Sequence, residues 1–171
     1  MNTPDAPLKD AVAQLPEDIA RYQHLHKKLP DGVKLEPGFT CVWNDRYFIH
    51  TRAVLPLLDL ENGIGFGLWV EVAKEDFDRY SEAVDDDEKY KIFRTDGMLA
   101  NEWPGFEGAY GLKVVVRTIK MDQKVYITEV LPDHPIDPLL QVSFLAQKGD
   151  EKTKESIRNV VVTWMGSNPE N

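Results

Sequence analysis

The chain has little cysteine and no long apolar run. Its 171 residues include a single cysteine, Cys41, so no disulfide can form within the chain and a multi-cysteine zinc site is excluded. Residues 1–5 show neither the basic segment nor the apolar run of a signal peptide. No apolar stretch approaches the roughly 18 residues that cross a bilayer. We therefore expect a cytoplasmic protein.

Positive charge is scarce as well. Twenty Lys and Arg residues stand against 29 Asp and Glu residues, which gives a formal net charge of −9. Nucleic-acid phosphates and anionic lipid surfaces both bind clustered Lys and Arg, so this balance disfavours nucleic acid and membrane as partners. It suits a basic or neutral protein partner instead, because an acidic surface steers cationic molecules toward itself.

Motifs for metal binding and for catalysis are missing. None of the four histidines belongs to a His-x-x-x-His or His-Glu-x-x-His pattern. The acidic run Asp85–Glu88 lacks the ligand spacing of a calcium loop. Cys41 lies in an apolar strand pattern, where a thiol is usually buried and inert. We predict no catalytic residues, no metal site and no cofactor.

The glycine-rich run Gly63–Gly67 resembles a phosphate-binding loop only superficially. Such loops follow a strand and open a helix, whereas this run leads into an expected strand. Three glycines on one strand face would instead let a bulky neighbour, such as a tryptophan, lie against the backbone.

The whole chain, residues 1–171, has the size and composition of a single domain. Hydrophobic residues make up 42% and charged residues 29% of it, which is ordinary globular usage. We divide it into a helical N-terminal extension (1–38), a sheet core with one helix (39–135) and a C-terminal segment (136–171). The apolar spacing in the C-terminal segment is mixed, and a helix is the interpretation we favour.

Three- and four-residue spacing predicts two helices in the N-terminal extension. Ala11, Val12 and Leu15 would share one face of the first. Pro16 suits the start of the second, which continues through Ile19.

Two-residue alternation predicts strands in the middle of the chain. The segments Cys41–Trp43 and Arg46–Leu55 flank Asn44-Asp45, a pair that favours a tight turn, so we expect a β-hairpin. The segment Ile64–Val72 alternates in the same way. 

A helix over 74–84 follows, and then two strands over 112–119 and 124–131. Strands grouped between helical ends predict an α+β fold, in which an antiparallel β-sheet has helices packed on one face and both the N- and C-terminal segments are helical.

One face of this sheet carries residue types that are common at binding surfaces. Arg and aromatic side chains are enriched there, and candidates of these kinds point away from the obvious core. The full candidate set is His50, Arg52, Trp69, Glu71, Arg117, Asp133 and His134. Two duller interpretations remain open: a helix covers this face, or the charges only solvate it.

Three functional hypotheses follow. The leading one is a non-enzymatic protein-binding, accessory or regulatory protein, with neutralisation of a toxin as one form. The alternative is a small-molecule enzyme or ligand-binding protein with His50, His134, Asp133 and Glu71 in a cleft, since acid–base chemistry needs such groups in a pocket. The third is a homo-oligomer formed through an exposed strand edge or the tryptophans.

Seven short elements follow one another between residues 39 and 138: Cys41-Val42, Tyr47-Phe48-Ile49, Phe66-Gly67-Leu68-Trp69-Val70, Phe77-Asp78-Arg79-Tyr80, Trp103-Pro104-Gly105-Phe106, Leu112-Lys113 and Asp133-His134-Pro135. In order and spacing they resemble a bacterial family, domain of unknown function 2199. Many members carry an N-terminal Cys-x-x-Cys element that this chain lacks, and an Arg where it has His50. The resemblance implies a shared fold and a bacterial origin. It does not imply a particular activity or particular catalytic residues.

Overall fold

The computed structural model describes residues 11–57, 60–102 and 109–130. These residues form three helices: α1 (Glu17–His26), α2 (Lys74–Ala83) and α3 (Asp87–Lys91). They also form eight strands: β1 (Ala11–Val12), β2 (Lys34–Glu36), β3 (Thr40–Trp43), β4 (Arg46–Leu57), β5 (Leu60–Val72), β6 (Arg94–Leu99), β7 (Lys113–Arg117) and β8 (Tyr126–Val130). None of the three helices has the length or the apolar character that crossing a bilayer requires.

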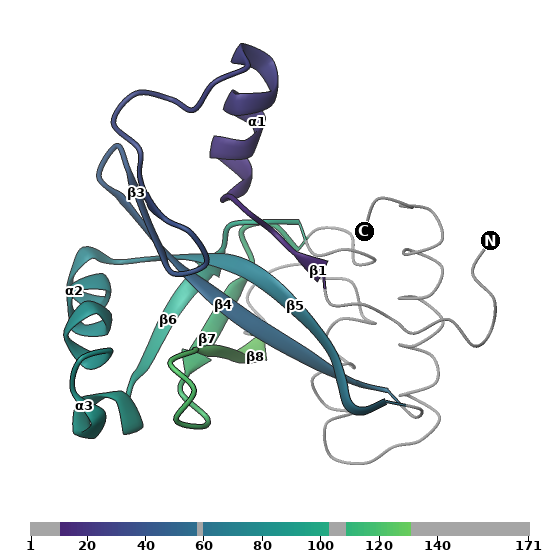
Figure 1. The fold of residues 1–171 in the computed structure, drawn as a ribbon, viewed down its shortest axis with the longest axis vertical. Coiled ribbons are helices and arrows are strands. Elements are labelled where there is room, and N and C mark those ends of the chain that lie inside the picture. The colour runs from purple at the N-terminus through teal and green to yellow at the C-terminus, as the bar shows by residue number, and fades with distance from the viewer. Residues whose placement is uncertain (1–10, 58–59, 103–108, 131–171) are drawn as a thin grey trace.

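The strands form one sheet that closes on itself. Its order is β1-β5-β6-β7-β8-β4-β3-β2, and an additional pairing between β4 and β5 makes β4 to β8 a closed barrel of five strands (Figure 1). Four of its five pairings are antiparallel. The fifth joins β8 to β4 in parallel at Arg52 and Tyr126, and the Arg52 N–H donates to the Val125 carbonyl at 2.9 Å.

The predicted α+β architecture is therefore wrong. The described chain is mostly β, with a closed barrel and three short helices, rather than an antiparallel sheet with helices on one face and helical ends. Two-residue alternation has the same period in an open sheet and in a barrel, so the sequence pattern does not distinguish them. The helix expected in 136–171 lies outside the described residues.

Two local predictions also fail. The first expected helix is replaced by β1, which pairs in parallel with β5; the Ala13 N–H then donates to the Gly67 carbonyl at 2.8 Å. Pairing with a distant strand overrides a short helical pattern here, because a helix of this length is marginal on its own. The strand expected over Arg46–Leu55 continues through Pro56 to Leu57 as β4, and the strand β6 was not expected at all.

Other local predictions are confirmed. Helix α1 begins directly after Pro16, and α2 lies where a helix was expected. The β3–β4 hairpin turns at Asn44 and Asp45, whose φ angles of 50° and 58° are those of the tight turn that matches the twist of paired strands.

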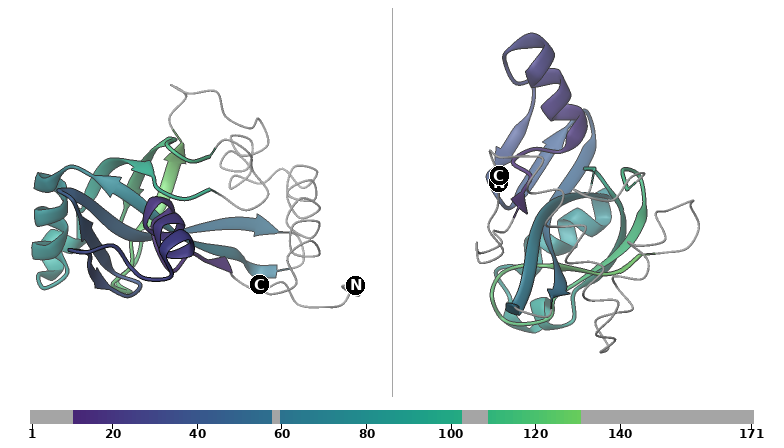
Figure 2. Two further views of the ribbon diagram at one scale, coloured as in Figure 1. Left: turned by 90° about the horizontal axis from the view of Figure 1, so that it is seen from above. Right: turned by 90° about the vertical axis from the view of Figure 1, so that its right-hand side faces the viewer.

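Described side chains of the long strands β4 and β5 pack into apolar clusters on both faces of the sheet. Their inner faces fill the barrel together with α2, through residues such as Ile49, Phe66 and Tyr80. Their outer faces pack a second apolar cluster against α1, in which Phe48 and Trp69 are fully buried. Helix α1 and the strands β2 and β3 project from the barrel, while α2 and α3 lie together at one of its ends (Figures 1 and 2).

Candidate functional site

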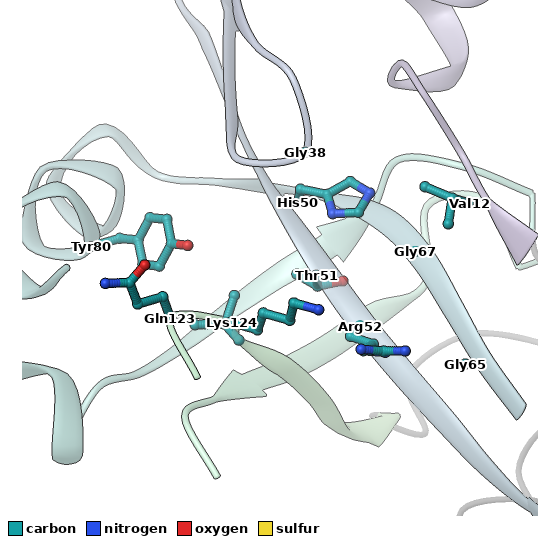
Figure 3. Close-up of a pocket in the computed structure, with 11 residues that line it drawn as sticks. Val12, Gly38, His50, Thr51, Arg52, Gly65, Gly67, Tyr80, Gln123 and Lys124 are labelled. Carbon is teal, nitrogen blue, oxygen red and sulfur yellow. The ribbon is translucent and has the colours of Figure 1, made fainter. Parts of the chain in front are cut away.

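A pocket of about 280 Å³ opens beside the seam where β8 joins β4. The residues His50, Thr51 and Arg52 of β4 form one wall (Figure 3). Glycines of β5 form part of another wall, and residues 123–125, directly before β8, contribute the polar side chains of Gln123 and Lys124. Closure of the barrel brings these three segments together.

His50 is the side chain of this pocket whose hydrogen-bonding capacity is not met by the described residues. Its ring packs against Trp69, the residue opposite it on β5, with ring centroids 5.0 Å apart in an edge-on arrangement. Its Nε2 atom is buried and, within the described part of the chain, has no hydrogen-bond partner. Buried polar atoms are almost always paired, so an unpaired nitrogen at a pocket wall needs an explanation.

Gly67 leaves the space that the imidazole occupies. A Cβ atom at Gly67 would lie 2.8 Å from His50 Cε1, 3.0 Å from His50 Nε2 and 3.0 Å from a methyl carbon of Val12. Gly67 therefore does accommodate a bulky neighbour against the backbone of β5, and that neighbour is a histidine rather than a tryptophan.

The surroundings of His50 keep its ring neutral. Burial lowers the pKa of His50 below its ordinary value of 6.5, because the charged ring would lose hydration. The backbone of Ala13 raises the pKa of His50, but by less than burial lowers it. The positive charge of Lys124 lowers this pKa further. At neutral pH the pocket therefore presents an uncharged imidazole beside a lysine.

The loop that carries Lys124 is held firmly in place. The Asp122 carboxylate accepts hydrogen bonds from the Tyr126 hydroxyl and from the Lys124 backbone N–H, the latter at 3.1 Å. Burial disfavours the ionised form of Asp122, but the bonds from Tyr126 and from the Lys124 backbone, together with the charge of Lys120, outweigh it, so the pKa of Asp122 is lowered. The Tyr90 hydroxyl donates to the Lys124 carbonyl at 2.6 Å. These bonds fix the loop and engage the acidic group nearest to Lys124 in sequence.

A second polar cluster lies at the other end of the same β4 face. The Arg46 guanidinium lies 2.9 Å from an oxygen of Asp18 on α1 and 2.8 Å from an oxygen of Glu71 on β5. The Tyr110 hydroxyl donates to Asp18 at 2.8 Å. The bond with Glu71 is the main reason that the pKa of Arg46 is raised. This cluster attaches α1 to the sheet.

The candidate residues from the sequence are spread over different places. His50 and Arg52 line the pocket together. Trp69 is fully buried and donates from Nε1 to the Ala13 carbonyl at 3.1 Å, while Glu71 is paired with Arg46. Arg117 is exposed on β7 and does not line the pocket, and 133–134, with the remaining Asp and His candidates, lie outside the described residues.

Sequence reasoning missed Lys124 and Gln123. The segment around them reads only as a hairpin turn, and nothing in its pattern indicates that β8 closes a barrel against β4. The positive φ of Gln123, 60°, belongs to that turn. The basic residue directly before a strand was the one signal present, and many surface lysines share it.

The described residues hold no metal-binding cluster and no activated thiol. Among them, no three His, Cys, Asp or Glu side chains lie close enough together to hold a metal ion. Burial raises the pKa of the Cys41 thiol to about 11, so at neutral pH it stays protonated and unreactive.

Comparison with known proteins yields a family and nothing narrower. No curated protein and no solved structure matches the chain. The model of a family described as "Uncharacterized protein conserved in bacteria (DUF2199)" matches residues 5–139, which include the pocket and the cluster around Arg46. The chain therefore belongs to DUF2199, a family of uncharacterised proteins conserved in bacteria.

Proposed function

We propose that the protein is a non-enzymatic binding protein that holds a small molecule in the pocket at His50. The observation that carries this proposal is the buried, unpaired Nε2 of His50 at the pocket wall. A buried polar atom without a partner costs about 1–3 kcal/mol, and a ligand that hydrogen-bonds to it removes this cost. The site thus favours an occupied state.

The form of the pocket supports the same function. Its volume of about 280 Å³ is close to the lower end of the roughly 300–1,000 Å³ typical of ligand pockets, which suits a molecule smaller than a drug. Apolar surface from Val12 and Val125 lies beside the polar groups of Gln123 and Lys124. A few convergent polar groups in an apolar cleft are the usual composition of a ligand site.

Binding is favoured over catalysis because the described lining of the pocket offers no carboxylate that could orient His50 as a base. A histidine that moves protons is normally oriented by a carboxylate or a similar group. No Asp or Glu belongs to the described lining, and Glu71, one of the carboxylates expected in a cleft with His50, is engaged by Arg46.

Nuclear magnetic resonance with a library of small polar fragments tests the proposal. We expect some fragments to shift the His50 imidazole nitrogens and the Gly67 amide together, while the exposed His24 ring stays unchanged and serves as the internal control. The variant His50→Leu should lose these shifts but keep the fold. A library that never perturbs His50 and Gly67, or fragments that bind His50→Leu equally well, would contradict the proposal.

A protein partner is the second candidate function, and one surface favours it. Ile92 is 82% exposed, Ile119 is 64% exposed and Met121 is 54% exposed. The first two lie on neighbouring segments, since the Thr118 N–H donates to the Phe93 carbonyl at 3.3 Å. Exposed apolar groups of this kind are common where proteins meet. 

A pull-down with wild type and Ile119→Asp, at low and at high salt, tests this candidate. A regulatory partner that docks on this surface should be captured by wild type and not by the variant. Equal capture by both would remove this surface from consideration.

A further inference from the structure

The charge of the pocket points to the chemical class of its ligand. We propose that the pocket binds a small oxyanion, a carboxylate or a phosphate, whose negative charge is held by Lys124. This inference rests on the proposed function, because it names the kind of molecule that the same pocket accepts.

The first observation is the contrast between the pocket and the rest of the chain. The chain has a net charge of −9. The described lining of the pocket nevertheless includes the cation of Lys124 and no Asp or Glu. Arg52 also lines the pocket, but it already has an interaction of its own, so the argument depends on Lys124. A concave site with a positive charge concentrates anionic ligands, even on a protein of unfavourable overall charge. Among the described lining residues, a cation would find no carboxylate.

The second observation is the position of Lys124. Figure 3 shows its side chain extending along the pocket toward β4, between His50 and Arg52. Among the described residues it forms no ion pair, in contrast to Lys74, Lys89 and Lys91 on the helices. Its backbone is held at both ends by Asp122 and Tyr90. A lysine on a fixed backbone, with no acidic partner in the described part of the chain, suits the binding of an anion.

The third observation is the electrostatic contact between Lys124 and His50. The charge of Lys124 already disfavours protonation of His50, so the two groups lie close enough to sense one another. An anion bound between them would compensate that charge and favour the protonated ring. A neutral ligand would leave it unchanged. In the described lining, the other charged or titratable groups are Arg52 on β4 and Tyr80 on α2, and the lining residues from β1 and β5 carry no charge.

Four aromatic probes of similar shape separate the possibilities: benzoate, phenyl phosphate, neutral benzamide and cationic benzamidine. We expect at least one of the two anions to bind about tenfold more tightly than benzamide, and benzamidine to bind most weakly, because one charge contact near a protein surface has that effect. Binding of the anion should weaken as salt is added. The relative affinities of benzoate and phenyl phosphate identify which oxyanion is preferred.

Variants of the lysine provide the decisive comparison. Lys124→Gln should weaken the anionic probe by about tenfold and leave benzamide unchanged, whereas Lys124→Arg should keep most of the affinity. Lys91→Gln, on α3 outside the pocket, is the matched control and should change nothing. Saturation with the anionic probe should also raise the pKa of His50, as followed by its ring resonances.

The outcomes distinguish the two proposals. If benzamide binds at His50 as tightly as the anions, or if Lys124→Gln leaves anion affinity unchanged, the oxyanion is overturned while small-molecule binding survives. If neither these probes nor the fragment library perturb His50, the proposed function itself fails.

Discussion

The outer face of β4 carries two polar clusters, one whose polar groups have hydrogen-bond and ion-pair partners and one in which a polar atom has none among the described residues. Arg46 and His50 are four residues apart on this strand, and both contact the neighbouring strand β5. Around Arg46, the carboxylates of Asp18 and Glu71 pair with the guanidinium, and the Tyr110 hydroxyl donates to Asp18. Around His50, one ring nitrogen is buried without a partner in the described chain, and a lysine nearby has no ion pair there.

This difference separates a structural cluster from a binding site. Hydrogen-bonded ion pairs that are complete within the protein hold elements together, as Arg46 holds α1 to the sheet. A polar group left incomplete lowers the free energy of unfolding, so it persists where something else benefits from it. The clusters are built from the same strand face, and only the partners provided by other elements make them different.

The largest effect is expected where the sheet itself has no space, next to the segment that carries Glu71. A Cβ atom at Gly97 would lie 2.5 Å from a methyl carbon of Val70 and 2.7 Å from the Glu71 carbonyl oxygen. Gly97→Ala should lower the free energy of unfolding by about 3 kcal/mol, because a backbone atom cannot rotate away. 

Gly67→Ala is the comparison at the pocket, where the new methyl group would meet the side chains of His50 and Val12. It should lower the free energy of unfolding by about 1 kcal/mol, since these side chains can adjust. Urea denaturation measures the free energy of unfolding of both variants. An equal decrease in the two would show that both glycines are equally intolerant of a methyl group.

Breaking the complete cluster should have the next largest effect. Arg46→Met leaves Asp18 and Glu71 partly buried without their cation, so we expect the free energy of unfolding to fall by about 2 kcal/mol. Lys74→Met, which removes an ion pair with Asp78 that is exposed to solvent, should lower it far less than Arg46→Met does. If the two variants are equally stable, the cluster at Arg46 is not the attachment of α1 that we describe.

Replacing the incomplete group should barely change stability. His50→Leu removes an unpaired buried nitrogen, a gain of about 1 kcal/mol, but loses an aromatic contact with Trp69 worth about 0.5–1.5 kcal/mol. The free energy of unfolding should therefore stay within about 1 kcal/mol of wild type, while probe binding is lost. A destabilisation as large as that of Arg46→Met would place His50 among the structural groups.

The smallest effect concerns pH. The pKa of His50 is lower in the folded protein than its ordinary 6.5, so the unfolded chain takes up the proton first as pH falls. This contribution to stability is complete above pH 6.5 and is lost as pH falls toward the folded pKa. Denaturation midpoints between pH 7.5 and 5 should decline more steeply for wild type than for His50→Leu. Parallel curves would mean that burial does not shift this histidine.

Local features of the fold were predictable because they depend on neighbours in sequence. Alternation in Ile64–Val72 correctly predicted a strand there, and Asn44-Asp45 identified the turn of the β3–β4 hairpin. The outer face of the same strands was not predictable in this way. Trp69 looked available to a partner, yet α1 and β1 cover it, and their packing depends on residues about 50 positions away in sequence.

The candidate site shows the same division. His50 and Arg52 were identified from the sequence because they share a strand face, which a two-residue period fixes. Lys124, at the end of a turn, reaches them only because β8 pairs with β4 in parallel, and pairing between strands distant in sequence leaves no mark in the local pattern of either.

By itself, the sequence determined the acidic character of the chain, the alternating strands, the hairpin and the helix after β5, since these follow from composition and from contacts between near neighbours. Only the tertiary structure decided that the sheet closes into a barrel, that Arg46 is paired with Asp18 and Glu71, and that His50 lines the same pocket as Lys124. Each of these depends on contacts between segments far apart along the chain. In such contacts, the segment that packs against a residue determines how deeply it is buried and which charged partners it has.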